Sequence, residues 1–185
     1  MTKSLQFLTP LVFFLLLAAF LWHGLDVDPR KLPSALLNKP APELNMPQLQ
    51  DSSKSFTNEQ LRGRVSMLHI WSSWCEVCRE EHPIIMDISR SKVLPIYGLV
   101  YKDDADKAKA VLRKYGNPYN AVAFDEEGKA AIDWGVYGVP ETYIIDAKGV
   151  IRYKQLGAIT PRIWKGIMLP LIHKLQEETK RSSSR

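Results

Sequence analysis

Two cysteines, the only ones among 185 residues, stand three positions apart at Cys75 and Cys78. They follow an apolar stretch, residues 65–71, whose length is typical of a buried strand, and a Ser-Ser pair comes soon after that stretch. A helix that begins at this pair of cysteines would carry both thiols on its first turn, close enough for a disulfide. The sequence therefore predicts a strand, a turn and a helix whose N-terminus holds a dithiol.

This position has a chemical consequence for the first thiol. Unpaired backbone N–H groups and the helix dipole stabilise a negative charge at a helix N-terminus. In Cys-x-x-Cys sites generally, the pKa of the first thiol falls to about 3.5–7.5. A thiolate attacks disulfides, and the second thiol then resolves the mixed disulfide. We therefore predict thiol–disulfide exchange, with Cys75 as the exposed nucleophile and Cys78 as the more buried resolving thiol.

Two other interpretations of the cysteine pair are weaker. Zinc usually takes four ligands, and the chain has no second cysteine pair. His69 and His82 could join in principle, but His69 falls inside the predicted strand and His82 lies a helical turn beyond Cys78. A purely structural disulfide would close almost no loop and would stabilise the fold little. We expect no metal and no cofactor other than the redox-active disulfide Cys75–Cys78.

Composition and charge are those of an ordinary globular domain. The chain is 45% hydrophobic and 24% charged, which suits one domain with a real core. The net charge of +5 is mild, and part of it lies in residues 178–185, which we expect to form a disordered basic tail. Basic residues are not interleaved with aromatic ones in any patch, so nucleic-acid binding is not expected.

The N-terminal segment is predicted to be a membrane anchor. Residues 11–22 form an unbroken apolar run, and apolar residues before it extend the segment to nearly the roughly 20 residues that a membrane span needs. No small-x-small cleavage site follows Ala18 and Ala19, and no cysteine is present there for lipid attachment. An uncleaved anchor over residues 1–25 is therefore favoured over a removed signal peptide.

The charges around this segment predict its orientation. Lys3 and the amino terminus favour a cytoplasmic N-terminus, which would place the remaining chain in the periplasm as a single-pass inner-membrane protein. Residues 26–39, which include Pro29 and Pro33, are predicted to be a stiff linker. The periplasm is kept oxidising, so a dithiol that acts as a reductant there needs a supply of electrons.

The rest of the chain alternates strand and helix patterns, which predicts an α/β fold with a mixed sheet and helices on both faces. Thr57 is expected to cap a short helical turn, Pro83 lies inside the helix after Cys75, and Pro170 is expected to interrupt the last helix. The predicted strands are residues 43–49 (an edge strand), 65–71, 93–100, 121–124, 141–145 and 150–156; the predicted helical segments are 56–61, 75–90, 105–115, 130–134 and 160–176.

Several motifs together resemble a known family. Trp74 before Cys-x-x-Cys, and the Val139-Pro140 dipeptide before a late strand, resemble the thioredoxin superfamily. Further stretches, at residues 78–83, 101–104, 116–119 and 135–142, resemble one branch of it. That branch is the membrane-anchored periplasmic thiol:disulfide interchange proteins of cytochrome c maturation, the CcmG/DsbE family. The resemblance covers residues 40–175 and the anchor, and it implies a thioredoxin-like domain over residues 40–177.

The resemblance implies a reductase. Electrons would come from a membrane thiol transporter of the DsbD or CcdA type. They would pass to the haem-binding cysteines of apocytochrome c, directly or through a partner dithiol protein of cytochrome c maturation. Two alternatives stay open: a general periplasmic thioredoxin-like reductase with other clients, and a redox-inert adaptor that holds its partners without turnover.

The resemblance also assigns roles around the dithiol. Glu81 matches an acidic residue behind the site, and the hypothesis is that it exchanges a proton with Cys78; the alternative is a solvated helix carboxylate. Pro140 matches a cis-proline that faces the disulfide and helps to bind the partner chain. Glu141 matches the acidic residue beside it, which would repel wrong partners or tune Cys75; its alternative is a solvated strand end. Trp74 is predicted to belong to the partner-docking surface or to serve simple packing.

Two positions depart from the family pattern. Glu76-Val77 stands between the cysteines, where many members have Pro-Thr, and a carboxylate beside Cys75 disfavours the thiolate. These positions bear on the strength of the reductant more than on the type of reaction. His69 replaces a neutral polar residue that is common in the family, and we expect a hydrogen-bonded core histidine.

Overall fold

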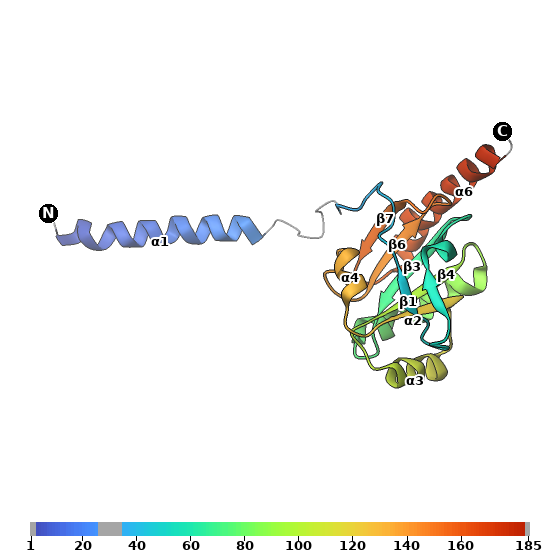
Figure 1. Ribbon diagram of the computed structural model, residues 1–185. Coiled ribbons are helices and arrows are strands. Elements are labelled where there is room, and N and C mark those ends of the chain that lie inside the picture. Colours follow the sequence, from blue (N-terminus) through green and yellow to red (C-terminus); the bar gives the residue numbers. More distant parts are fainter. Residues whose placement is uncertain (1–2, 26–34, 184–185) are drawn as a thin grey trace. The chain divides into compact units, whose positions relative to one another are not determined.

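The computed structural model describes residues 3–25 and 35–183 and divides the chain into two units, Met1–Pro33 and Ser34–Arg185 (Figure 1). The first unit contains one described helix, α1 (Lys3–Leu25). Among the residues that the structure describes, no helix combines the length and the apolar character needed to cross a membrane. The anchor predicted for residues 1–25 stays a prediction, and residues 26–34 of the predicted linker lie outside the described residues.

The second unit begins earlier than the sequence predicts. The N–H of Asn38 donates to the carbonyl of Ile151 over 2.7 Å, and the N–H of Ala41 donates to the carbonyl of Gly149 over 2.8 Å. These bonds fasten residues 38–41 to the start of the last strand. The end of the segment predicted as a linker, up to residue 39, is therefore part of the folded domain, because its backbone groups find partners there.

The core of the domain is a mixed sheet, as predicted, and the sheet has five strands. β3 lies at its centre and is buried along its whole length, parallel to β4 on one side and antiparallel to β6 on the other (Figure 1). In spatial order the strands are β5 (Ala121–Asp125), β4 (Ile96–Tyr101), β3 (Ser66–Trp71), β6 (Glu141–Ile145) and β7 (Ile151–Leu156).

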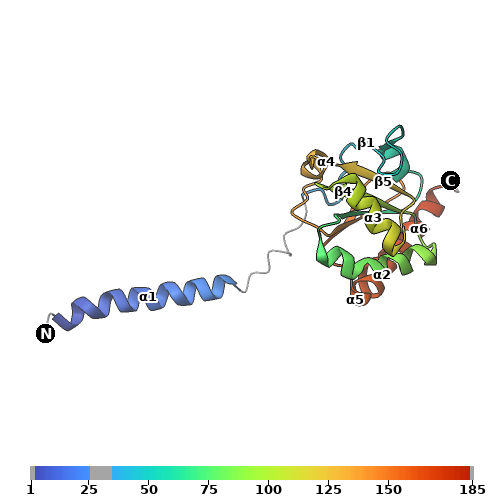
Figure 2. The same cartoon turned by 90° about the horizontal axis from the view of Figure 1, so that it is seen from below.

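Helices cover both faces of this sheet, which confirms the predicted layering. The steps from β3 to β4 to β5 run in one direction, so right-handed crossovers place α2 (Glu76–Ser91) and α3 (Ala105–Tyr115) on the same face. The C-terminal helix packs on that face too, and the short α4 (Lys129–Asp133) lies on the opposite face with the N-terminal elements (Figure 2).

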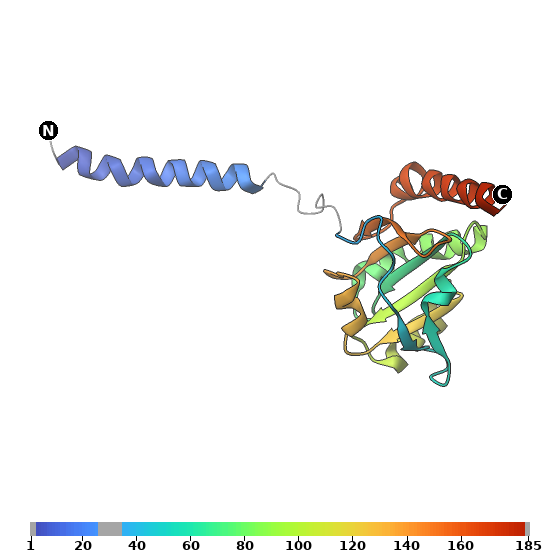
Figure 3. The ribbon, with the colours of Figure 1, turned by 45° about the horizontal axis from the view of Figure 1, so that its top comes forward.

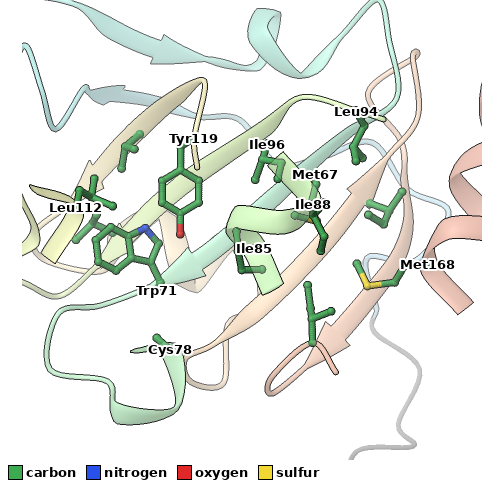
Figure 4. Close-up of a cluster of buried hydrophobic side chains, with 14 of the residues drawn as sticks. Met67, Trp71, Cys78, Ile85, Ile88, Leu94, Ile96, Leu112, Tyr119 and Met168 are labelled. Atoms are coloured by element: carbon green, nitrogen blue, oxygen red, sulfur yellow. The ribbon is translucent and has the colours of Figure 1, made fainter. Parts of the chain in front are cut away.

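Alternation along β3 divides its side chains between two apolar clusters. Met67 and Trp71 belong to the cluster under α2 and α3 (Figure 4), and Leu68 and Ile70 belong to the cluster on the other face. Because successive strand residues point to opposite faces, His69 shares the face of Met67 and Trp71. The central strand therefore carries a histidine into the layer where the dithiol helix packs.

The N-terminal edge differs from the prediction. The segment predicted as an edge strand forms β1 (Asn45–Pro47), which pairs with β2 (Ser55–Thr57) in a separate two-stranded sheet. A single bridge from Gln48 to Ala123 connects it to β5, and Pro47 has no N–H to extend a ladder. The short turn η2 (Asn58–Leu61) follows, and the N–H of Thr57 donates to Gln60 Oε1 over 2.7 Å, which confirms a capped turn there.

The C-terminal helical segment is interrupted and longer than predicted. Thr160 caps α5 (Pro161–Ile163), a π-helical turn η3 (Trp164–Met168) follows, and α6 (Leu169–Ser183) completes it (Figure 3). Pro170 cannot donate a backbone hydrogen bond, and the wider turn before it accommodates this loss. Residues 178–183 are helical, so the predicted disordered tail is wrong for them; basic residues suit the end of a helix because of its dipole. Residues 184–185 lie outside the described part.

Candidate active site

The two cysteines form a disulfide at the N-terminus of α2. Their Cα atoms lie 5.2 Å apart, and Cys75 is itself the capping residue of the helix. The N–H of Cys78 donates to the Sγ of Cys75 over 3.0 Å. This bond points a backbone dipole at the sulfur that the sequence assigns as nucleophile, which favours a thiolate once the disulfide is reduced.

The two cysteines are almost equally buried, whereas the sequence predicted an exposed Cys75 and a more buried Cys78. Cys75 is 5% exposed and Cys78 is 4% exposed, so in the oxidised protein both are covered. The Sγ of Cys75 lies 3.7 Å from the carbonyl oxygen of Val139, beneath the loop that precedes β6. Trp74 beside it is 56% exposed. The distinction between nucleophile and resolving thiol therefore rests on the hydrogen bond to Cys75, not on exposure.

Trp74 is exposed but held in place. Its Nε1–H donates to the carbonyl of Lys102 over 2.9 Å. The preceding residue is fixed as well, because Asp103 accepts hydrogen bonds from both the backbone N–H and the hydroxyl of Ser73. An ordered aromatic side chain at the rim of the disulfide suits the predicted docking role, which stays a prediction. The role of Asp103 was not predicted, because its partner lies 30 residues earlier.

Pro140 lies where the family resemblance implies. The Val139–Pro140 peptide bond is cis, and Pro140 is buried. The carbonyl of Val139 is the group that approaches Cys75, and the carbonyl of Pro140 accepts the N–H of Gly157 over 2.9 Å. The expected cis-proline beside the disulfide is confirmed, and its part in partner binding stays a prediction.

Glu141 is buried and ion-paired, so the solvated strand end considered for it is wrong. Its Oε2 lies 3.0 Å from the Nζ of Lys154 and 3.1 Å from the hydroxyl of Tyr143, and its Oε1 accepts the N–H of Tyr137 over 2.9 Å. Burial, and next the charge of Glu141, raise the pKa of the Tyr143 hydroxyl. With its charge matched by Lys154, Glu141 is a poor candidate for repelling partners and a good one for fixing the loop at Tyr137.

Glu81 is also buried, which excludes the solvated alternative. It lies three residues after Cys78 and therefore on the same side of α2. Its Oε1 is 2.8 Å from the Nε2 of His69, and its Oε2 accepts the N–H of Ile159 over 2.7 Å. The other ring nitrogen of His69 is 2.8 Å from the hydroxyl of Tyr119. The expected hydrogen-bonded core histidine is confirmed, and it belongs to a buried chain of polar groups behind the disulfide.

Tyr119 was not predicted as part of the site. Burial, and next the charge of Glu81, raise the pKa of its hydroxyl well above the ordinary value, so the group stays neutral. Its ring stacks on Trp71 with centroids 5.9 Å apart (Figure 4). Strand alternation could have placed His69 on the side of Glu81, but no local signal links His69 to a tyrosine 50 residues later.

Disulfide exchange is the reaction for which this arrangement has the necessary groups. Across the residues described, no three His, Cys, Asp or Glu side chains are grouped to hold a metal ion. The site has a reducible bond, a backbone donor aimed at the sulfur of Cys75, and a buried carboxylate one helical turn after Cys78. These are parts that exchange uses. Fold and site together define a thiol–disulfide oxidoreductase of the thioredoxin superfamily.

Comparisons with known proteins agree with this class and narrow it. The Redoxin family model matches residues 36–165. The chain is 45% identical over 175 residues to the thiol:disulfide interchange protein DsbE of Allochromatium vinosum, covering 95% of this chain and 97% of the relative. It is 38% identical over 182 residues to DsbE of Escherichia coli, covering 95% and 98%. The chain belongs to the DsbE (CcmG) family of thiol:disulfide interchange proteins.

Solved structures show the same fold. A crystal structure described as a putative thiol:disulfide interchange protein DsbE from Chlorobium tepidum aligns with a TM-score of 0.64 at 23% identity. The alignment covers 75% of this chain and 97% of that one. A solution structure of a putative protein disulfide isomerase from Bacteroides thetaiotaomicron aligns with a TM-score of 0.65 at 20% identity, over 80% and 95% of the two chains.

Proposed function

We propose that the protein is a membrane-anchored periplasmic reductant that delivers electrons to the haem-binding cysteines of apocytochrome c, directly or through a partner dithiol protein. The observation that carries the proposal is the disulfide between Cys75 and Cys78 at the N-terminus of α2, with a backbone N–H aimed at the Sγ of Cys75. Membership of the DsbE family supports the reaction type.

The surface beside the disulfide supports reaction with another protein. Three exposed apolar or aromatic side chains, Trp74, Val77 and Tyr137, lie on the segments next to Cys75 and the cis-proline. Tyr137 is 83% exposed, and its ring lies over the Nζ of Lys154 at 4.6 Å. Fixed aromatic rings favour protein partners, because they give contact area at a small cost in conformational entropy.

The proposed reaction has two steps. The thiolate of Cys75 attacks one sulfur of the target disulfide, a Cys75–target bond forms, and the other target sulfur leaves and takes up a proton. Cys78 then gives its proton to Glu81, attacks the Sγ of Cys75 and releases the second target sulfur, which is protonated in turn. Two electrons pass from the protein dithiol to the target, and the Cys75–Cys78 disulfide is restored.

Each cycle consumes the dithiol, so the protein needs a reductant. A membrane thiol transporter of the DsbD or CcdA type would supply two electrons by the same exchange in reverse. The apolar run at residues 11–22, which carries no charged residue, supports anchoring at the membrane where that donor resides. Deleting residues 1–25 behind a cleavable signal peptide should release the protein into the soluble periplasmic fraction. Retention of the truncated chain in washed membranes would contradict the anchor.

Trapping in the parent cell tests the proposed client. Without the resolving thiol, Cys78→Ser should accumulate mixed disulfides at Cys75, and these should contain apocytochrome c or a dithiol protein of its maturation. The double variant Cys75→Ser/Cys78→Ser is the matched control and should trap nothing. A broad set of unrelated clients would replace the proposal with a general reductase, and the absence of any adduct would replace it with an adaptor.

The direction of electron flow is tested separately. Equilibration of the Cys75–Cys78 pair with glutathione gives its reduction potential. We expect a potential on the reducing side of the glutathione couple, because the proposed role is that of a donor. A potential near the oxidising end of known dithiol proteins would reverse the assignment. Glu76 itself favours a reducing potential, because its carboxylate disfavours the Cys75 thiolate and with it the reduced form.

A further inference from the structure

His69 occupies an unusual place for an ionisable side chain. It lies in the middle of β3, is 2% exposed, and faces the layer that contains α2. The residues opposite it on the flanking strands are Gly98 on β4 and Thr142 on β6. Neither can form an ion pair, so the partners of the His69 ring come from outside the sheet.

The two ring nitrogens meet groups of different kinds. Nε2 lies 2.8 Å from the carboxylate of Glu81, and Nδ1 lies 2.8 Å from the hydroxyl of Tyr119. If the Tyr119 O–H donates to Nδ1, the neutral ring carries its proton on Nε2 and donates it to Glu81. The reverse assignment would leave a bare nitrogen facing the carboxylate. With Glu81 ionised, the first assignment satisfies all three side chains.

Tyr119 fits the role of a fixed donor. Burial raises the pKa of its hydroxyl, which therefore stays protonated at neutral pH. Its ring is held by stacking on Trp71, and Gly98 leaves the space that both rings occupy. A Cβ on Gly98 would lie 3.2 Å from the Cγ of Tyr119 and 3.2 Å from the Nε1 of Trp71. Tyr119 thus reaches across β4 to His69 because β4 has no side chain at that point.

We propose that His69 is a positioning residue for the resolution step: its Nε2–H, oriented by Tyr119, keeps Glu81 in the carboxylate form that accepts the proton of Cys78. This inference rests on the proton-accepting role of Glu81 proposed above. The carboxylate then has two donors, the N–H of Ile159 on one oxygen and His69 on the other. Donors to a buried carboxylate favour its ionised form, which is the form that can take a proton.

Among the described residues, Glu81 is the one charged side chain in close contact with His69. From α2 come Glu81 and His82, and the ring of His82 is directed instead at the carbonyl of Gly116, 3.0 Å away. Burial lowers the pKa of His82, which is therefore neutral at neutral pH. Opposite His69, β6 carries the uncharged Thr142 and β4 carries Gly98, and the N–H of Ile159 before α5 binds Glu81. A change at His69 should therefore act on Glu81 first.

Reaction of the reduced full-length protein with an aromatic disulfide, whose released thiolate is coloured, tests the inference. The first equivalent of thiolate reports attack by Cys75, and the second reports resolution by Cys78. In His69→Leu we expect an unchanged first phase. We expect the acid limb of the second phase to move to higher pH, because the Nε2–H of His69 no longer stabilises the carboxylate that accepts the proton of Cys78. At neutral pH the second phase should slow by up to about tenfold.

Graded variants separate positioning from simple packing. His69→Gln keeps an N–H donor of similar reach and should therefore retain most of the rate of the second phase. Tyr119→Phe should shift the acid limb of the second phase in the same direction as His69→Leu does, but by less. His173→Gln, at an exposed histidine on α6, should match the parent in both phases. Unfolding midpoints of the oxidised variants show that each has folded.

The outcomes distinguish this inference from the role of Glu81. If Glu81→Gln slows the second phase while His69→Leu leaves its pH midpoint unchanged, the inference about His69 is overturned and the Glu81 role stands. If Glu81→Gln also leaves the second phase unchanged, both are overturned, while exchange through Cys75 and Cys78 is unaffected. An equal loss in both phases of His69→Leu would also overturn the inference, since it would indicate a general structural role.

Discussion

Two buried carboxylates flank the disulfide, and their partners differ. Glu141 at the start of β6 is paired with the ammonium of Lys154, whereas Glu81 on α2 is paired with the imidazole of His69. The lysine ammonium brings a full positive charge to its partner, whereas the contact between His69 and Glu81 is a hydrogen bond. The charge of the first carboxylate is matched and its position fixed, and the second is the one that we propose accepts a proton. Similar burial thus supports two different roles.

The largest effect is expected when the ion pair between Glu141 and Lys154 is removed. Glu141→Gln leaves the charge of Lys154 unmatched where the two side chains are 3% and 5% exposed, and we expect a loss of about 3–5 kcal/mol of unfolding free energy. Denaturant unfolding of the oxidised protein measures it. Glu141→Gln combined with Lys154→Met should recover most of the loss. A shift in the pH profile of resolution for Glu141→Gln would contradict the structural role assigned here.

The second prediction addresses Glu81. Glu81→Gln keeps an acceptor for the N–H of Ile159 but cannot take a proton from Cys78. Resolution should therefore slow by about 10²-fold, as expected for the loss of a general base. Single-turnover kinetics with a model disulfide measures it, and unfolding of the same variant should change by no more than about 1 kcal/mol. A stability loss as large as that of Glu141→Gln, with resolution intact, would reverse the comparison.

A third, smaller effect is expected at Gly98. An alanine Cβ would press on the rings of Trp71 and Tyr119, and both would have to move by a few tenths of an ångström. We expect Gly98→Ala to cost about 1 kcal/mol of unfolding free energy and to weaken the contact between Tyr119 and His69. Gly138→Ala, where a Cβ would meet open space, is the control. Equal stability of the two variants would show that the rings are not closely held.

The smallest effect concerns His82, whose pKa is lowered mainly by burial. The unfolded chain binds a proton there at higher pH than the folded one. The stability that follows is present above the ordinary histidine pKa, 6.5, and is lost as pH falls through the lowered value. Unfolding free energy should therefore fall less between neutral and mildly acidic pH in His82→Gln than in the parent. His173→Gln should follow the parent, and an identical slope in all three would contradict the assigned shift.

Much of the fold could be predicted from local patterns. The helix over residues 105–115 and the strand over residues 141–145 agree with α3 and β6, because a capping aspartate and an apolar run bounded by turns are local signals. The separate β1–β2 sheet and the helical end of α6 were not predicted. Pairing partners of short strands and the continuation of a polar helix depend on packing that the sequence does not display.

The sequence predicted the chemistry of the site, but it did not predict which residues contact one another there. Cys75, Cys78 and the cis-proline followed from motifs. The buried ion pair of Glu141 did not, because Lys154 lies on the neighbouring strand and strand register brings the two side chains together. The partners of Glu81 come from β3 and from the segment between β7 and α5. Motifs identify the two cysteines and the proline, but tertiary contacts determine which partner each carboxylate has.

Alkylation of the reduced, folded protein shows whether Cys75 is the nucleophile. Brief treatment with iodoacetamide at neutral pH, followed by peptide mapping, shows which thiol reacts. We expect Cys75 to be modified at least about tenfold faster than Cys78, because the helix N-terminus and the N–H of Cys78 favour its thiolate. Faster labelling of Cys78, or a Cys75 that never reacts in the folded protein, would contradict it.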